Sequence, residues 1–424
     1  MSGTVLIIGT LDTKARELAY LRQRIEAEGA RTILMDVSCK SIHPEIQADI
    51  SCRAVAAETG RDFSEVALLD KAAAPGVMTL GAIRAAGKLT AEGRFQGIIG
   101  LGGANGAEMA CAVMRELPVG FPKLMVTCVA SGNVRPYVGT KDIIMVNSIG
   151  DISLNRITRR IISNAARAIA RMALAGPLEE EDTKPQVCIS TFGVTLPCVE
   201  KAKGILEEKG FEVIELHASG TGGMALEELV RSGEISGVLD ITTSEIVDDL
   251  VGGMYSAGPH RLEAAAETGT PQVISLGALD FGNFGGRETI PPAYRDRHFF
   301  FYTPSITLMR TTRDEGEVLG RRIAEKANAS RGPTAVIVPR KGFSLLDRAG
   351  GKKRTRIDGA DAGDWYDEAA DGALIDAIKK HLDPSRVELV EMDAHINDPE
   401  FAEAAVELLI RLIHRTSIPP NLLL

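Results

Sequence analysis

Short apolar runs alternate with longer segments of helical period along the whole chain. In the first half, runs rich in Ile, Val, Leu and Met predict buried strands at residues 5–8, 32–35, 97–100, 123–127 and 143–146. Between them, apolar positions spaced three or four apart predict helices at residues 13–28, 48–59, 76–89, 107–115 and 156–175. This alternation is typical of a parallel sheet that helices cover on both faces.

The same pattern starts again after residues 176–185, a connecting segment with two prolines and an acidic run. It predicts strands at residues 186–190, 212–216, 237–241, 272–275, 334–339 and 387–391, and helices at 197–209, 224–232, 367–381 and 399–414. The restart resembles a distant internal repeat. We therefore predict an α/β fold with two Rossmann-like, doubly wound parallel-sheet domains, at residues 1–180 and 186–424, that face a cleft.

Composition narrows the range of partners. The chain has 424 residues, and 48 Lys and Arg against 57 Asp and Glu give a net charge of −9, with only 4% aromatic residues. An acidic chain with few aromatic rings lacks the field and the stacking surface that nucleic acid requires, so we expect no nucleic-acid partner. No apolar run reaches the ~18 residues of a membrane span, and the start lacks the features of a signal peptide. Six cysteines without metal-ligand spacing fit a cytoplasmic protein with reduced thiols.

The strongest candidate for chemistry is the glycine-rich turn at residues 100–106, between a predicted strand and a predicted helix. Glycines at such a turn let backbone N–H groups face an anion at the positive end of the helix. The spacing matches neither the P-loop nor the NAD fingerprint. Anion binding is the favoured interpretation, and a tight turn that allows close helix packing is the alternative. The residues concerned are Gly102, Gly103, Asn105 and Gly106.

Two other turns follow predicted strands of the same sheet. The first holds Thr10, Asp12, Thr13 and Lys14, and the second holds Ser131 and Asn133. Helix capping explains Asp12 and Thr13, and a self-satisfied polar turn explains Ser131 and Asn133. Because the carboxyl ends of parallel strands meet at one edge, both turns are also placed to complete a pocket around one ligand.

In the second half, Asp240 and Glu245 flank a hydroxyl-rich strand end and are candidates for Mg²⁺ binding or acid–base catalysis. The alternative is helix capping by Thr243 or Ser244, with Glu245 in the first turn of the next helix. Asp280 opens the segment 280–286, which resembles a loop shaped for a ligand, and a Gly-Asn turn that needs no ligand is the alternative. Arg310 could offer a guanidinium to a phosphate or carboxylate, and a surface salt bridge explains it equally well.

The turns at residues 9–14, 100–106 and 131–133, together with Asp393-Ala394-His395-Ile396-Asn397-Asp398-Pro399, resemble the Tm-1-like ATP-binding family over nearly the whole chain. The resemblance implies two Rossmann-like subdomains, ATP as the ligand and a homodimer. It assigns phosphate contacts to Gly102, Gly103, Asn105 and Gly106, with Thr10, Asp12, Thr13 and Lys14 alongside and Ser131 and Asn133 at the border. Residues 350–364, basic in their first half, depart from the family pattern and are predicted to form a mobile loop.

Three functions remain open at this point. The first is an ATP-binding protein, with Mg²⁺ as a candidate companion ion. The second is an enzyme that acts on a small phosphorylated or carboxylated metabolite such as a sugar acid, with Asp240, Glu245 or Asp280 as acid–base groups. The third is a non-catalytic ligand sensor whose domain closure changes a protein-facing surface.

Overall fold

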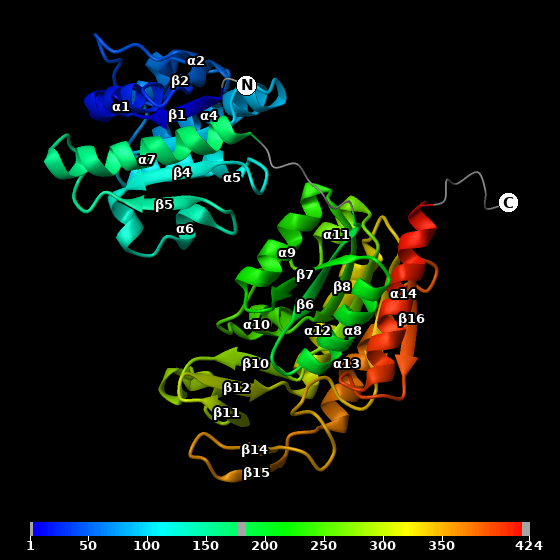
Figure 1. Ribbon diagram of the computed structural model, residues 1–424. Helices are drawn as coiled ribbons and strands as arrows, with labels where there is room; N and C mark the ends of the chain where they lie inside the picture. Colours follow the sequence, from blue (N-terminus) through cyan, green and yellow to red (C-terminus); the bar gives the residue numbers. More distant parts are fainter. Residues whose placement is uncertain (1–2, 177–183, 418–424) are drawn as a thin grey trace. The chain divides into compact units, whose positions relative to one another are not determined.

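The computed structural model describes residues 3–176 and 184–417. The chain divides into two compact units, Met1–Glu180 (unit 1) and Glu181–Leu424 (unit 2), shown in Figure 1. Most of the predicted connecting segment, residues 177–183, lies outside the described residues. The predicted cleft between the two domains stays a prediction.

Unit 1 contains a five-stranded sheet in which every pairing is parallel, in the order β2-β1-β3-β4-β5. Its strands are β1 (Thr4–Gly9), β2 (Arg31–Asp36), β3 (Gly97–Leu101), β4 (Lys123–Thr127) and β5 (Ile144–Asn147). Its helices are α1 (Leu11–Glu26), α2 (Cys52–Ala57), α3 (Phe63–Leu68), α4 (Ala73–Ala91), α5 (Ala104–Arg115), α6 (Arg135–Val138) and α7 (Arg156–Ala175), with a 3₁₀ turn η1 (Cys128–Ser131). All five predicted strands are therefore present.

The alternating side chains of β1 show why the strands are apolar throughout. Val5 and Ile7 belong to a core with α1 and α7, whereas Leu6 and Ile8 belong to a core with α2, α4 and α5. A strand buried on both faces has no polar positions to alternate with apolar ones. The helix predicted at residues 48–59 is shorter than expected, because Ile50 bridges Met35 in extended form before α2 begins.

Unit 2 is built on a second parallel sheet of six strands, in the order β16-β13-β9-β8-β6-β7. Its strands are β6 (Gln186–Thr191), β7 (Glu212–His217), β8 (Ile235–Thr242), β9 (Gln272–Gly277), β13 (Thr334–Pro339) and β16 (Val387–Met392). Its helices are α8 (Leu196–Glu208), α9 (Thr221–Ser232), α10 (Glu245–Val251), α11 (Ala264–Thr268), α12 (Arg313–Asn328), α13 (Glu368–His381) and α14 (Pro399–Ser417). The order β7-β6-β8-β9 repeats the order β2-β1-β3-β4 of unit 1, in agreement with the repeated sequence pattern.

Unit 2 also carries an antiparallel sheet that the sequence analysis did not predict, in the order β10-β12-β11-β14-β15. Its strands are β10 (Phe281–Phe284), β11 (Phe299–Thr303), β12 (Ile306–Arg310), β14 (Lys353–Thr355) and β15 (Asp361–Asp364), with 3₁₀ turns η2 (Arg287–Thr289) and η3 (Pro292–Tyr294) nearby. The prediction of a mobile loop at residues 350–364 is wrong, because β14 pairs with β15 in a hairpin and Thr355 pairs with Phe299. Across the residues that the structure describes, no helix is long and apolar enough to cross a membrane.

Candidate functional site

A pocket of about 620 Å³ opens at the carboxyl edge of the unit 1 sheet. Its lining comes from the turns after β1, β2 and β3, and from the start of α4 and the first turns of α5. The lining residues are Thr10, Asp12, Thr13, Lys14, Cys39, Lys40, Lys71, Ala74, Pro75, Gly103, Ala104, Asn105, Gly106 and Met109. The structure therefore brings together the first and the glycine-rich turns that the sequence analysis selected.

The strand order explains why the pocket lies there. β1 and β3 are neighbours, but the chain leaves β1 towards β2 on one side and leaves β3 towards β4 on the other. The two connections diverge and leave a crevice outside the carboxyl ends of β1 and β3. Open α/β sheets bind ligands at this switch point.

The entrance of α5 carries backbone donors that no protein group uses. Gly103 is the N-cap residue, with φ −68° and ψ −161°, and no side chain caps the helix. Within the described parts of the chain, the N–H groups of residues 103–106 have no hydrogen-bond acceptor. These donors lie at the positive end of a 12-residue helix and belong to pocket-lining residues.

Gly102 differs from the other glycines of this turn. Its N–H donates to the Val126 carbonyl at 3.2 Å, and it does not line the pocket. A Cβ at this position would lie 2.9 Å from the Cα of Gly106. The Gly102 amide is therefore already bonded and the residue serves close packing, and the predicted phosphate contact at Gly102 stays a prediction.

Three lysines surround the pocket, and two of them already have partners. Lys14 Nζ donates to the Ile152 carbonyl, and Lys40 Nζ donates to the carbonyls of Ala67 and Leu69. These two lysines hold the segments around the pocket in place, and their ammonium groups add positive charge to the pocket. Lys71 is exposed and has no bonding partner in the part of the chain that the structure describes, so its ammonium is available to a ligand.

The entrance of α1, in contrast, is closed by side chains from the end of β2. Asp36 accepts the N–H of Leu11 at 3.0 Å, and Ser38 Oγ accepts the N–H of Asp12 at 2.9 Å. The hydroxyls of Thr10 and Thr13 bond each other at 2.6 Å. The first turn therefore contributes side chains to the pocket, whereas its own helix amides are occupied.

Ser131 and Asn133 lie outside the pocket lining. Ser131 Oγ donates to the Cys128 carbonyl at 3.1 Å, and Asn133 Oδ1 accepts the N–H of Arg135 at 3.1 Å. Both side chains thus make the local bonds of a polar turn. Their role at the border of a ligand stays a prediction.

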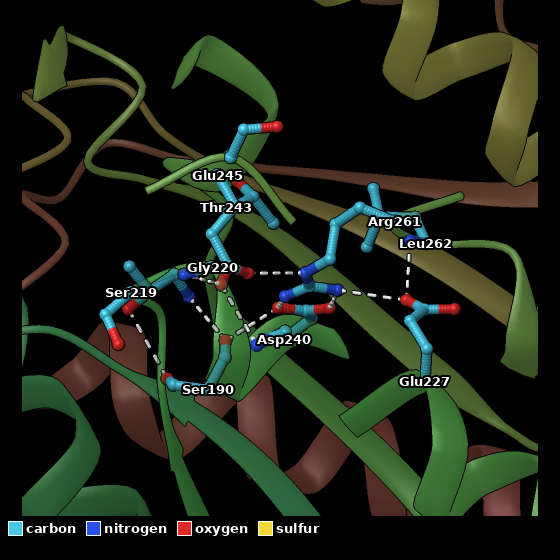
Figure 2. A network of polar contacts seen from close by, with 12 residues as sticks. Ser190, Ser219, Gly220, Glu227, Asp240, Thr243, Glu245, Arg261 and Leu262 are labelled. Carbon is cyan, nitrogen blue, oxygen red and sulfur yellow. Dashed lines mark hydrogen bonds and ion pairs between the residues drawn. The ribbon is translucent and has the colours of Figure 1, made fainter. Parts of the chain in front are cut away.

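Asp240 and Glu245 of unit 2 meet in a buried network around Arg261, which Figure 2 shows. Asp240 accepts two hydrogen bonds from the Arg261 guanidinium, both at 2.6 Å, and Glu245 Oε2 accepts from Arg261 Nε at 2.7 Å. Glu227 joins the same guanidinium at 3.3 Å. Burial raises the pKa of Glu245, and Arg261 opposes that shift. The sequence analysis missed Arg261 and Glu227, because neither lies in a motif.

Glu245 also fills a glycine-rich turn of unit 2, at residues 220–223. Its Oε1 accepts the N–H of Gly220 at 2.7 Å and the N–H of Gly223 at 2.9 Å, at the entrance of α9. The protein thus supplies its own carboxylate where an anion would bind. Asp240 and Glu245 are almost completely buried, and their predicted Mg²⁺ or acid–base roles stay predictions.

Asp280 lies in a second buried network. It accepts hydrogen bonds from Ser344 Oγ at 2.8 Å and from Trp365 Nε1 at 2.7 Å. The prediction of a ligand loop at residues 280–286 is wrong, because residues 281–284 form the buried strand β10. Arg310 is likewise buried and pairs with Asp347 and Asp371, so it is not a surface ion pair. The predicted acid–base role of Asp280 stays a prediction.

Solved structures give only a weak match. UDP-N-acetylglucosamine 2-epimerase from Rickettsia bellii aligns with 64% of this chain and 78% of its own, at 12% identity and a TM-score of 0.23. A likeness at this level carries no information on function.

Sequence relatives match far more strongly. A UPF0261 protein of Clostridium tetani is 40% identical over 98% of this chain and all of its own length, and one of Rhizobium meliloti is 41% identical over 95% and 97%. The ToMV resistance protein Tm-1(GCR237) of Solanum lycopersicum is 34% identical over 97% of this chain, which spans 56% of that protein.

Family models agree with these relatives over both units. The N-terminal domain of the uncharacterised protein family UPF0261 matches residues 3–177, and the C-terminal domain of the same family matches residues 184–413. Since these matches cover nearly the whole chain, the protein belongs to the UPF0261 family, which includes Tm-1-like proteins.

Proposed function

We propose that unit 1 binds the phosphate groups of a nucleotide, with ATP as the candidate ligand, in the pocket between the first and the glycine-rich turns. The observation that carries this proposal is the set of unbonded backbone N–H groups at residues 103–106, which belong to lining residues of the pocket. Amides at a helix entrance bind phosphate oxygens through both hydrogen bonds and the helix dipole.

The charge and shape of the pocket support this ligand. Three lysines and one aspartate line it, so the lining side chains carry an excess of positive charge. Its volume of about 620 Å³ is within the range of small-molecule sites. Ala74, Pro75 and Met109 supply an apolar wall for a non-phosphate portion of the ligand.

Asp12 is the residue that would hold Mg²⁺. Its carboxylate is the one acidic group among the lining residues of the described pocket, beside the hydroxyls of Thr10 and Thr13. Mg²⁺ is commonly held by one or two carboxylates together with substrate phosphates and water. The ion would supply charge neutralisation between the phosphates when bound.

Calorimetric titration of the full chain with ATP, ADP, inorganic phosphate and gluconate tests the proposal. We expect ATP to saturate a single site per chain and to raise the unfolding free energy by ~2.7 kcal/mol at ~100 times its Kd. Lys71→Ala should weaken binding and reduce its dependence on salt. Lys352→Ala is the matched control, because Lys352 is likewise exposed and without a side-chain partner among the described residues, and it does not line the pocket.

The other probes decide between the remaining functions. Saturation by gluconate without saturation by ATP would favour the metabolite enzyme, because the same amides accept a carboxylate. If none of the four compounds binds at millimolar concentration, the anion site itself is refuted.

We further propose that the chain forms a homodimer through the edge strand β5. In the described sheet β5 pairs with β4 alone, and Ile144 on it is 47% exposed. Just beyond the strand, Ile149 is 73% exposed and has a φ of 69°, an unusual conformation for a β-branched residue. Antiparallel pairing of β5 with β5 of a second copy would cover the edge strand of each copy. Light scattering should show a dimer that Ile144→Lys dissociates, and a monomeric wild type would contradict the proposal.

A further inference from the structure

Unit 2 holds two buried arginines, and each faces three carboxyl groups. Arg261 faces Glu227, Asp240 and Glu245, and Arg310 faces a second set. That second set is Asp280, Asp347 and Asp371. If every carboxyl group were ionised, each cluster would carry more negative than positive charge in the protein interior, which is costly unless other donors compensate.

In the Arg261 cluster, backbone donors supply that compensation. Glu227 accepts the N–H groups of Leu262, Glu263 and Ala264, at 2.6, 3.1 and 2.6 Å, beside the start of α11. Glu245 accepts two amides at the entrance of α9, and Asp240 accepts the guanidinium twice and Ser190 Oγ at 2.6 Å. Among the described residues, no carboxylate oxygen of this cluster is without a partner. All three groups can therefore remain ionised.

The Arg310 cluster has fewer such donors: the Phe343 N–H donates to Asp347 Oδ2 at 2.9 Å, and Ser344 and Trp365 both donate to the same oxygen of Asp280. Asp280 Oδ1 and Asp371 Oδ2 are buried and have no hydrogen-bond partner within the described residues. Arg310 directs Nε to the Trp365 carbonyl and Nη1 to the Asp280 carbonyl, each at 3.0 Å. Only its Nη2 reaches carboxylates, at 2.7 Å from Asp371 and 3.4 Å from Asp347. One guanidinium nitrogen cannot neutralise three buried carboxylates.

Protonation removes this imbalance. Burial raises the pKa of Asp371 to about 6, and burial together with the nearby Asp280 charge raises the pKa of Asp347 well above its ordinary value. Burial likewise raises the pKa of Asp280, against the influence of Arg310. Among the described residues, Asp280 and Asp371 each keep one buried carboxylate oxygen without a partner, whereas both oxygens of Asp347 have one, so the geometry places the need for a proton in the shared cluster.

The cluster also anchors the end of the β14–β15 hairpin. Trp365, directly after β15, donates from Nε1 to Asp280, and its carbonyl accepts from Arg310. Trp365 is completely buried and is the single tryptophan of the sequence. The hairpin is thus attached at its end to groups whose charges depend on a proton.

We propose that a proton held among Asp280, Asp347 and Asp371 is a structural component of unit 2, and that its loss at alkaline pH releases the β14–β15 hairpin. The folded state then binds a proton that the unfolded chain has already released above ~4. Stability from this source is full at acidic pH and falls as pH rises through the folded-state range, the opposite of an ordinary salt-bridged aspartate.

Other charged and titratable groups face the cluster from the elements packed against it. On the hairpin and α13 side, Tyr366 interacts with Asp347 and Asp371, and Asp367 interacts with Arg310; Glu368 acts on Tyr366, and Arg354 acts on Asp367. On the side of the turn after β16, His395 interacts with Asp280, and Arg348 acts on His395. Of these, His395 has its pKa lowered by burial and stays neutral above neutral pH, so it does not change charge in the range where the proton would be lost.

Tryptophan fluorescence of the full chain, from about pH 5 to about pH 9, follows the cluster directly. We expect a shift in Trp365 emission with rising pH, accompanied by a fall in the thermal unfolding midpoint. Asp347→Asn and Asp371→Asn imitate the neutral acid, so each should lose the fluorescence transition and unfold at or above the wild-type temperature at alkaline pH. Glu227→Gln, in the Arg261 cluster, is the matched control and should keep the transition.

Three results would overturn the proposal. The first is a wild-type chain whose Trp365 emission is independent of pH. The second is a transition that both asparagine variants retain. The third is a failure of both asparagine variants to fold at any pH, since a site that holds a neutral acid must accept its amide analogue.

Discussion

At the scale of single residues, the glycines in the glycine-rich turn of unit 1 have different roles. Gly102 allows close packing, and Gly103 leaves the amides of the helix entrance open to the pocket. Gly102 lies so close to Gly106 that a side chain would collide, whereas a Cβ at Gly103 would meet nothing within 4 Å. Ala104 follows at the first helical position and is exposed. The turn therefore needs glycine at one position for space, and it offers amides at the next positions to a ligand.

Ala104→Pro should remove one ligand contact without disturbing the helix. Proline is favoured at the first helical position, and the extended conformation of Gly103 suits a residue before proline. We expect phosphate affinity to fall roughly tenfold to a hundredfold, as for the loss of a hydrogen bond to a charged group, about 1.5–3 kcal/mol. Calorimetry measures the change. Ala104→Val, which keeps the N–H and adds comparable bulk, should bind almost normally; equal losses in both variants would count against amide recognition.

At the scale of elements, three helix entrances illustrate three solutions to the same problem. The first N–H groups of any helix need acceptors. At α1 they are accepted by Asp36 and Ser38, and at α9 by Glu245. At α5 the amides of residues 103–106 have no acceptor in the described chain. The proposed ligand site is thus the helix entrance whose amides the described chain leaves without acceptors.

Asp36→Ala should destabilise the entrance of α1. It leaves the buried N–H groups of Leu11 and Ser38 without an acceptor, which costs roughly 3 kcal/mol. Urea unfolding monitored by circular dichroism measures the loss. Asp36→Asn keeps an acceptor oxygen and should lose clearly less, and equal losses in the two variants would contradict the capping role of Asp36.

At the scale of the whole molecule, the two units share a strand order but differ in how they use it. In unit 1 the switch point between β1 and β3 opens into a pocket. In unit 2 the equivalent residues 242–245, after β8, are completely buried. The second copy of the architecture is therefore closed by its own side chains, and only unit 1 presents an open site at this position.

Glu245→Ala should test this division between the units. The change leaves two amides and one side of Arg261 without a partner, and breaking a buried ion pair typically costs about 3–5 kcal/mol. We expect unit 2 to unfold earlier in denaturant, while the affinity of unit 1 for phosphate stays unchanged. Glu245→Gln retains an acceptor for the amides and should be milder. A loss of phosphate affinity in Glu245→Ala would show that the units are coupled.

Two features of unit 2 were not predicted from the sequence: the antiparallel sheet, and the roles of Arg261 and Glu227. The antiparallel sheet had a readable signal, because two β-rich runs, residues 299–303 and 306–310, are separated by two turn residues, the spacing of a hairpin. In contrast, no local signal marked Arg261 or Glu227, whose partners in this cluster lie 16 to 37 residues away.

By itself, the sequence determined the periodicity of strands and helices, the α/β class and the positions of the turns, because each depends on neighbours along the chain. Only the tertiary structure decided which turn amides stay free. Asp36 accepts the Leu11 N–H and Glu245 accepts the Gly220 N–H, and in each pair the two residues are 25 positions apart in the sequence. Among the described residues, no such side chain accepts the N–H groups of residues 103–106. Whether a helix entrance binds a ligand or its own protein depends on acceptors brought from distant segments, which spacing along the chain cannot reveal.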